Sequence, residues 1–126
     1  LPRTVIIARH LLQQYGFEHH CAALHAIDLP VLALEDGTGF AQGKVRDRCI
    51  RAMREDGCGA IVLGCGGMAN LAQELTRELG IPVIDGVTAA VKMVESLLGL
   101  GLGTSKRGDL AYPNKKPLTG CFAMLS

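Results

Sequence analysis

The sequence has 126 residues, which is the length of a single domain. Its 13 basic and 12 acidic residues give a net charge of +1, so it lacks the basic surface expected of a protein that binds nucleic acid or an anionic membrane. No run reaches the roughly 18 apolar residues that a membrane span needs. The 16 glycines, set against three phenylalanines, two tyrosines and no tryptophan, suit an α/β protein with many strand-to-helix turns.

The chain contains five cysteines, an odd number without CxxC spacing. This pattern indicates free thiols in a reducing compartment rather than a disulfide framework, and it argues against a zinc site. The N-terminus has no secretory signal, so we expect a cytoplasmic protein. The chain begins with LPRT and no initiator Met, and we therefore expect it to be part of a longer polypeptide.

The first half of the chain is expected to hold two helices with a strand between them. Apolar residues at helical spacing predict a helix over residues 2–14, with Gly16 as its C-cap. Residues 21–27 resemble a strand and lead into a loop-rich stretch. A second helix is predicted over residues 41–55, with an apolar inner face of Val45, Cys49, Ile50 and Met53.

The second half predicts alternating strands and helices. Residues 60–63, AIVL, form a short apolar run bounded by glycines, which is typical of a buried parallel strand. A glycine turn and a helix over residues 68–79 follow it. A second strand over residues 81–84 and a helix over residues 87–98 come next. This order predicts an α/β fold, a parallel sheet flanked by helices.

The tail has a different composition, rich in glycine, lysine and proline and without periodicity. We expect residues 1–100 to form an α/β lobe and residues 101–126 to form an extended tail that packs on another lobe. Units of this kind normally begin with a strand, whereas this one begins with a predicted helix. We therefore expect the lobe to lack its first strand.

The sharpest chemical feature is the motif LGCGGM at residues 63–68. It places Cys65 at the carboxyl end of a buried strand and at the start of a helix, where ligands bind in open α/β sheets. Unpaired backbone N–H groups and the helix dipole would stabilise a thiolate there. Gly66 and Gly67 would let a ligand approach the backbone and offer N–H donors to a developing oxyanion. The alternative is a small buried cysteine in a tight turn.

Other candidate residues have structural interpretations. Cys49 and Cys21 are expected in the core. His19 and His20 are expected at the surface, because neighbours on a strand point to opposite faces and do not converge on one ion. Asp85 follows the second strand at the same sheet edge as Cys65, where it would cap the next helix or line the site. We predict no metal site.

The motif at residues 63–68, the run GIPVIDGV at residues 80–87 and the segment TSK at residues 104–106 together resemble the aspartate/glutamate/hydantoin racemase superfamily, closest to its hydantoin and allantoin racemases. The resemblance implies one lobe of a two-lobed racemase-like fold. It also implies a reaction without a cofactor, in which two cysteines act on opposite faces of the substrate carbon. Members have roughly double this length. We further expect a homo-oligomer.

The resemblance assigns roles to particular residues. Cys65 matches the second-lobe catalytic cysteine, and Gly66 and Gly67 match the backbone cradle for substrate. Leu1 and Thr4 fall in a segment where the family often places substrate contacts. The amino-acid racemases of the superfamily usually carry Thr and then Glu or His after this cysteine. The two glycines here favour a cyclic ureide, such as allantoin or a 5-substituted hydantoin.

Besides these two glycines, the chain departs from the family in having no second LGC-like motif. The resemblance therefore covers the C-terminal half of such an enzyme, and the N-terminal lobe with its cysteine is missing. The hypothesis is a cofactor-independent racemase of allantoin or 5-substituted hydantoins, inactive as this isolated half. Alternatives are a cysteine isomerase or decarboxylase on the same scaffold, or a non-catalytic fragment that binds a ligand.

Overall fold

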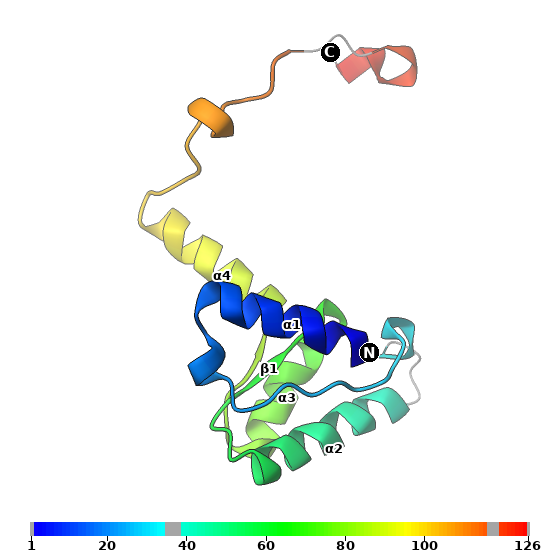
Figure 1. Cartoon of the computed structure of the whole chain (residues 1–126). Helices are drawn as coiled ribbons and strands as arrows, with labels where there is room; N and C mark the ends of the chain where they lie inside the picture. The colour runs from blue at the N-terminus through cyan, green and yellow to red at the C-terminus, as the bar shows by residue number, and fades with distance from the viewer. Residues whose placement is uncertain (1, 35–38, 116–118, 126) are drawn as a thin grey trace. The chain divides into compact units, whose positions relative to one another are not determined.

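The computed structural model describes residues 2–34, 39–115 and 119–125. The chain divides into two compact units, Leu1–Lys92 and Met93–Ser126, and each is described by itself. The first unit contains both strands and the first three α-helices, α1 to α3 (Figure 1). Within the described residues, no helix has the length and apolar character that crossing a bilayer requires.

Helix α1 spans Pro2–Tyr15 and confirms the helix predicted at the start of the chain. Proline suits the first turn because its missing N–H group would have no partner there. Gly16 ends the helix with a φ of 71°, as predicted. The Gly16 amide donates to the carbonyl of Gln13 and the Phe17 amide to that of Leu12, at 3.1 and 2.9 Å, which is a Schellman motif.

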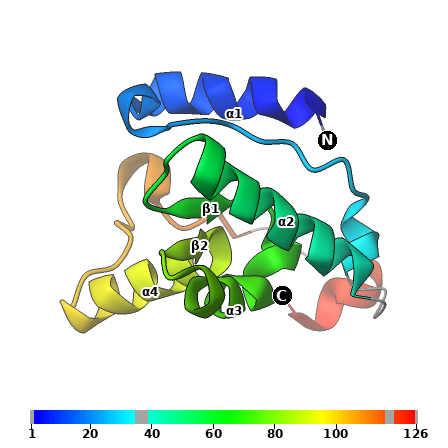
Figure 2. The ribbon, with the colours of Figure 1, turned by 90° about the horizontal axis from the view of Figure 1, so that it is seen from below.

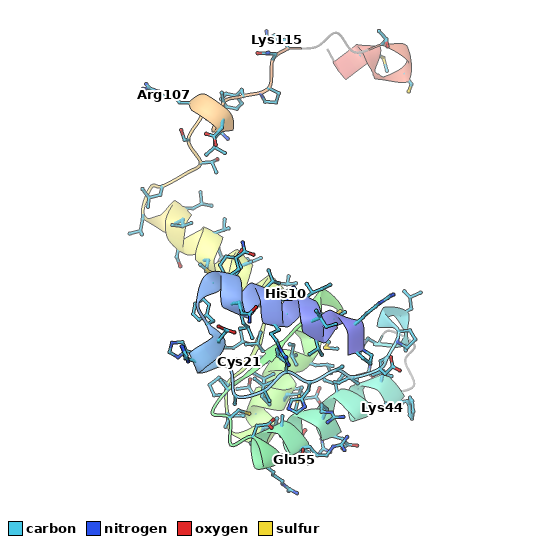
Figure 3. All side chains as sticks on the ribbon, in the orientation of Figure 1. His10, Cys21, Lys44, Glu55, Arg107 and Lys115 are labelled. Carbon is cyan, nitrogen blue, oxygen red and sulfur yellow. The ribbon has the colours of Figure 1, made fainter. Side chains whose placement is uncertain are left out.

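The strand predicted over residues 21–27 is wrong. This segment is irregular and runs back in the direction opposite to α1 (Figure 2). A strand needs a neighbour for its backbone groups, but the described strands β1 and β2 pair with each other. Side chains hold the segment instead: His25 Nε2 lies 2.5 Å from Asp56 Oδ2. Cys21, labelled in Figure 3, is partly exposed, so its predicted place in the core is wrong too.

Helix α2 spans Phe40–Glu55 and confirms the second predicted helix, with Lys44 and Glu55 near its two ends (Figure 3). Of the predicted inner face, Val45 and Cys49 are buried, whereas Ile50 and Met53 are partly buried. Alanines 41 and 52 complete the buried face. The core joins α2 to the sheet and to α3, and its buried apolar residues are Leu34, Ala41, Val45, Cys49, Leu63, Ala72, Leu75 and Val83.

The sheet consists of two parallel strands, β1 (Ile61–Leu63) and β2 (Val83–Asp85), which lie side by side (Figure 2). Helix α3 (Ala69–Leu79) connects them, so the predicted strand–helix–strand unit is confirmed. Ile61 pairs with Val83 and Leu63 with Asp85. Leu63 and Val83 face the core, whereas the alternate residues Val62 and Ile84 are 73% and 43% exposed on the other face.

Thr76 of α3 fastens the beginning of β2. Its hydroxyl oxygen accepts a hydrogen bond from the Val83 amide at 2.9 Å. The same oxygen lies 2.8 Å from the Ala72 carbonyl and 3.2 Å from the Val83 carbonyl, to which the hydroxyl can donate. In a parallel pair, alternate amides of one strand point away from the neighbouring strand. Thr76 therefore supplies the partner that the outer edge of β2 needs at Val83.

Helix α4 spans Gly86–Gly99 and confirms the last predicted helix. The unit Met93–Ser126 contains the end of α4, a turn with Gly101 at a φ of 72°, and 3₁₀ helices at Gly108–Leu110 and Gly120–Leu125. Lys106 in this unit donates to Thr104 Oγ1 at 3.1 Å and lies over the ring of Tyr112. The described residues of the tail are exposed where their side chains are placed.

Replacing Thr76 by Val should lower the free energy of unfolding by about 1–3 kcal/mol, because the part-buried Val83 amide would lose its acceptor while the side-chain shape is kept. Urea unfolding followed by far-UV circular dichroism measures the effect. The Thr76→Ser variant keeps the hydroxyl and should lose less. Equal losses in the two variants would show that the hydroxyl does not carry this contribution.

Candidate active site

The register of the sheet brings the carboxyl ends of both strands to one edge. Leu63 lies opposite Asp85, so Cys65 follows β1 at the edge where Asp85 ends β2. Cys65 is extended, with φ −148° and ψ 133°, and is followed by a 3₁₀ turn at Gly66–Met68 that leads directly into α3. The structure thus confirms the predicted place of the cysteine between a strand and a helix.

The turn after Cys65 offers backbone donors. The Met68 amide donates to the Cys65 carbonyl at 3.1 Å, and the Ala69 amide donates to the Gly66 carbonyl. The amides of Gly66 and Gly67 precede these two and occupy the first positions of the turn, where the helical pattern provides no acceptor. Both glycines are exposed. An anionic or carbonyl oxygen of a ligand could accept from them.

The glycines beside Cys65 differ from those of the loops. Gly16 and Gly80, which stand in turns, have a positive φ, a conformation that favours glycine. Gly64 and Gly66 do not have a positive φ. A Cβ atom at Gly64 would meet no atom within 4 Å. At Gly66 it would lie 3.5 Å from Val87 Cγ2, an ordinary contact. Neither backbone conformation nor crowding requires glycine at positions 64 and 66. Because the two residues have no side chain, they leave the main chain open to a ligand.

Asp85 is a second ionisable group at this edge, and its carboxylate has a structural role as a helix cap. The residue is 5% exposed, and its Oδ1 accepts from the Thr88 amide at 2.7 Å. This confirms the capping role for α4. Hydrogen bonds from the Thr88 backbone, the largest cause, hold the pKa of Asp85 below its usual value, although desolvation opposes them. Asp85 is therefore an ionised structural cap.

The other cysteines lie elsewhere. Cys49 is in the core as predicted, and burial raises the pKa of its thiol, which makes it a poor source of thiolate. Cys21 donates to the Ala23 carbonyl at 3.4 Å. Cys58 precedes β1, at the end of the strand opposite Cys65. Cys121 is exposed in the second unit. Of the cysteines in the first unit, only Cys65 lies at the carboxyl edge of the sheet.

The remaining predicted site residues do not join this edge in the described part of the chain. Thr4 is exposed in the first turn of α1, on a separate element, and Leu1 lies outside the described residues. His19 and His20 form part of an exposed 3₁₀ turn, Glu18–His20. No cluster of three or more metal-ligating side chains occurs in the described ranges. A shallow hollow over α2, lined by Asp47, Ile50 and Arg51, lies on another element.

Sequence reasoning missed Val87 as a neighbour of the cysteine turn and Thr76 as the fastening of β2. The register of β1 on β2 brings the start of α4 to Gly66, and a short apolar run does not specify register by itself. No sequence pattern indicated that the Thr76 hydroxyl would bind the backbone of β2. It lies on a helix, and its partner at Val83 is set by the packing of α3 on the sheet.

Comparison with protein families supports the resemblance inferred from the motifs. The family model described as Asp/Glu/Hydantoin racemase matches residues 1–94. A hydantoin racemase of Rhizobium meliloti is 52% identical over 120 residues, which cover 95% of this chain and 50% of that protein. The match thus includes both strands and the Cys65 turn.

Solved structures agree with the sequence comparison. An allantoin racemase from Klebsiella pneumoniae has 78% sequence identity and a TM-score of 0.82, covering 99% of this chain and 51% of that one. An allantoin racemase from Pseudomonas fluorescens has 42% identity and a TM-score of 0.75, covering 95% and 51%. The predicted α/β racemase-like fold is confirmed. The chain spans about half the length of the relatives it matches.

Replacing Asp85 by Asn should make the protein less stable at pH 7, and the difference from the unchanged chain should disappear in acid. Because the folded-state pKa of Asp85 is lowered, its contribution is present above the unfolded value of about 3.9 and is lost as the pH falls through the folded value. Urea midpoints measured between pH 7 and pH 2 test this. Asp28→Asn, at an exposed position, is the control. A stability difference that persists unchanged into acid would contradict the prediction.

Proposed function

Because the chain belongs to the Asp/Glu/hydantoin racemase family, we propose that it carries one half of the active site of a racemase acting on allantoin or 5-substituted hydantoins. Cys65 is one of the two groups that transfer the proton. The observation that carries the proposal is the position of this cysteine, partly exposed at the carboxyl edge of the sheet and followed by two exposed glycines.

Among the residues that the structure describes, Cys65 and Asp85 are the ionisable groups considered at this edge, and their environments separate their roles. Asp85 is a buried residue, and its carboxylate holds the first turn of α4. Cys65 is partly exposed and its side chain makes no capping hydrogen bond to the turn that follows it. A proton-transfer group must reach a substrate atom and must change its protonation state during the reaction. Cys65 meets both requirements better than Asp85 does.

The proposed reaction moves protons only. For one enantiomer, the Cys65 thiolate removes the proton from the stereocentre and becomes a thiol, while a thiol on the opposite face donates its proton to the planar carbanion. The thiolate has then moved from Cys65 to the second group, which is the state needed to convert the other enantiomer back. Amides of Gly66 and Gly67 would stabilise the enolate-like oxygen. This scheme requires no cofactor.

The second thiol must face Cys65 across the substrate. The described cysteines of the first unit do not meet this need, since Cys49 is buried and Cys58 lies at the other end of β1. We propose that a first lobe of a longer parent polypeptide supplies it. That agrees with relatives about twice as long. Residues 1–100 would be the second lobe, and residues 101–126 would pack back on the first.

The cyclic ureide class is favoured by the names of the relatives and by the two glycines after Cys65. Hydantoin racemase and allantoin racemase are the descriptions of the matched proteins. A ring held flat against the turn needs a main chain without side chains, which Gly66 and Gly67 provide. Leu1 and Thr4 are further proposed substrate contacts, on the family resemblance. We also propose a cytoplasmic homo-oligomer.

In the parent polypeptide, Cys65→Ser should reduce racemisation of allantoin about 10²–10⁴-fold in both directions, because a hydroxyl replaces the thiol as the proton carrier. The decay of the circular-dichroism signal of (R)- and of (S)-allantoin gives both rates. The same reaction in deuterium oxide should place deuterium at the stereocentre without other bond cleavage. Unchanged rates in both directions would exclude Cys65 as a proton-transfer group.

The Gly66→Ala variant should keep its stability and lose activity about tenfold or more in kcat/KM. Its Cβ has room in the fold but would occupy the space proposed for substrate. Gly59→Ala, in the loop before β1, is the matched control, because that glycine also lies outside the α-helices and has no crowding and no positive φ. Urea midpoints and racemisation rates are compared for both variants. A fully active Gly66→Ala enzyme would refute the cradle role of this glycine.

A further inference from the structure

We propose that Val87 is a specificity-determining residue, and that its isopropyl group limits the size of the substituent carried by the substrate's stereocentre. The inference rests on the proposed racemase function and deepens it. Val87 belongs to the first turn of α4, next to the Cys65 edge, but it had no assigned role in the chemistry above.

The position of Val87 follows from the register of the sheet. Leu63 and Asp85 are paired, so two residues beyond each strand the chain reaches Cys65 on one side and Val87 on the other. The two residues are close neighbours, since a Cβ atom placed at Gly66 would lie 3.5 Å from Val87 Cγ2. The Val87 side chain therefore borders the open main chain immediately after the cysteine.

Val87 is also held firmly. The Asp85 carboxylate binds the Thr88 amide at 2.7 Å and fixes the first turn of α4. A β-branched side chain in a helix has one strongly preferred χ1 rotamer. The wall that Val87 presents is consequently rigid, and a rigid wall discriminates by size better than a flexible one does. Methionine or lysine at this position would not do so.

Val87 is 50% exposed in spite of its apolar side chain. On the same helix, Val91 is one turn further along and 51% exposed. The two valines thus share residue type, helix and exposure, but of the two it is Val87 that lies within 4 Å of a Cβ placed at Gly66. An apolar wall beside the cysteine would contact the substituent at the stereocentre, since this is the carbon that the thiol must reach.

The test compares two substrates that differ in this substituent, 5-methylhydantoin and 5-benzylhydantoin. In the parent polypeptide, Val87→Ala should raise the ratio of kcat/KM for the benzyl over the methyl compound about tenfold, as expected for the loss of two carbons from the wall of an apolar pocket. Val87→Phe, with a larger side chain, should lower the ratio. Val91→Ala should leave the ratio unchanged. A Val87→Ala ratio equal to that of Val91→Ala would overturn the specificity role.

A second measurement does not depend on racemase activity. In the 126-residue chain, Cys65 is alkylated with iodoacetamide or with a bulky aryl maleimide, and peptide mass mapping gives both rates. Val87→Ala should raise the relative rate of the bulky reagent at least about threefold, whereas Val91→Ala should not. An unchanged reagent ratio would refute the wall. If the parent racemises neither allantoin nor the two hydantoins, the proposed function fails, and the alkylation ratio still decides whether Val87 borders Cys65.

Discussion

The parallel pairing of β1 on β2 is the constraint on which the candidate site depends. Only three residues from each strand take part, yet their register decides what stands beside Cys65. A shift of one residue would reverse the faces of β2, exposing Val83 and burying Ile84. The core contacts of Leu63 and Val83 with α2 and α3 oppose that shift, and the Thr76 hydroxyl fixes Val83 directly. Packing on one face of the sheet thus determines the chemistry at its edge.

The elements that could be predicted from the sequence are those specified by nearby residues. Glycine after an apolar stripe marked the end of α1 at Gly16, and a glycine-bounded apolar run marked β1. The segment at residues 21–27 shows why the same reasoning fails elsewhere. Its composition suits a strand, but a strand exists only where a partner strand is present, and that is a property of distant residues. The His25–Asp56 contact, 31 positions apart, holds the segment in its place.

The site divides in the same way. Cys65, Gly66 and Gly67 form one contiguous motif, so their arrangement could be predicted before the fold was known. The role of Asp85 stayed open between cap and site residue until the Thr88 hydrogen bond showed it to be the cap. The proposed role of Val87 could not be predicted from the sequence, because it depends on the distance between Val87 and Gly66 across the sheet edge. The substrate-contact roles of Leu1 and Thr4 rest on the family resemblance alone. Thr4 lies on α1, a separate element from the Cys65 turn, and Leu1 is outside the described residues.

The register also has a consequence for folding. Ile61 and Val83 are close in the chain for a parallel pair, with only α3 and its turns between them. Contacts of such short sequence separation form quickly, because little chain entropy is lost in closing the intervening loop. The two paired strands, the helix that connects them and the first turn of α4 lie within this one contiguous stretch, and α2 adds its core contacts from outside it. The sheet edge that carries Cys65 can therefore form early in folding, from contacts that are mostly local in the sequence.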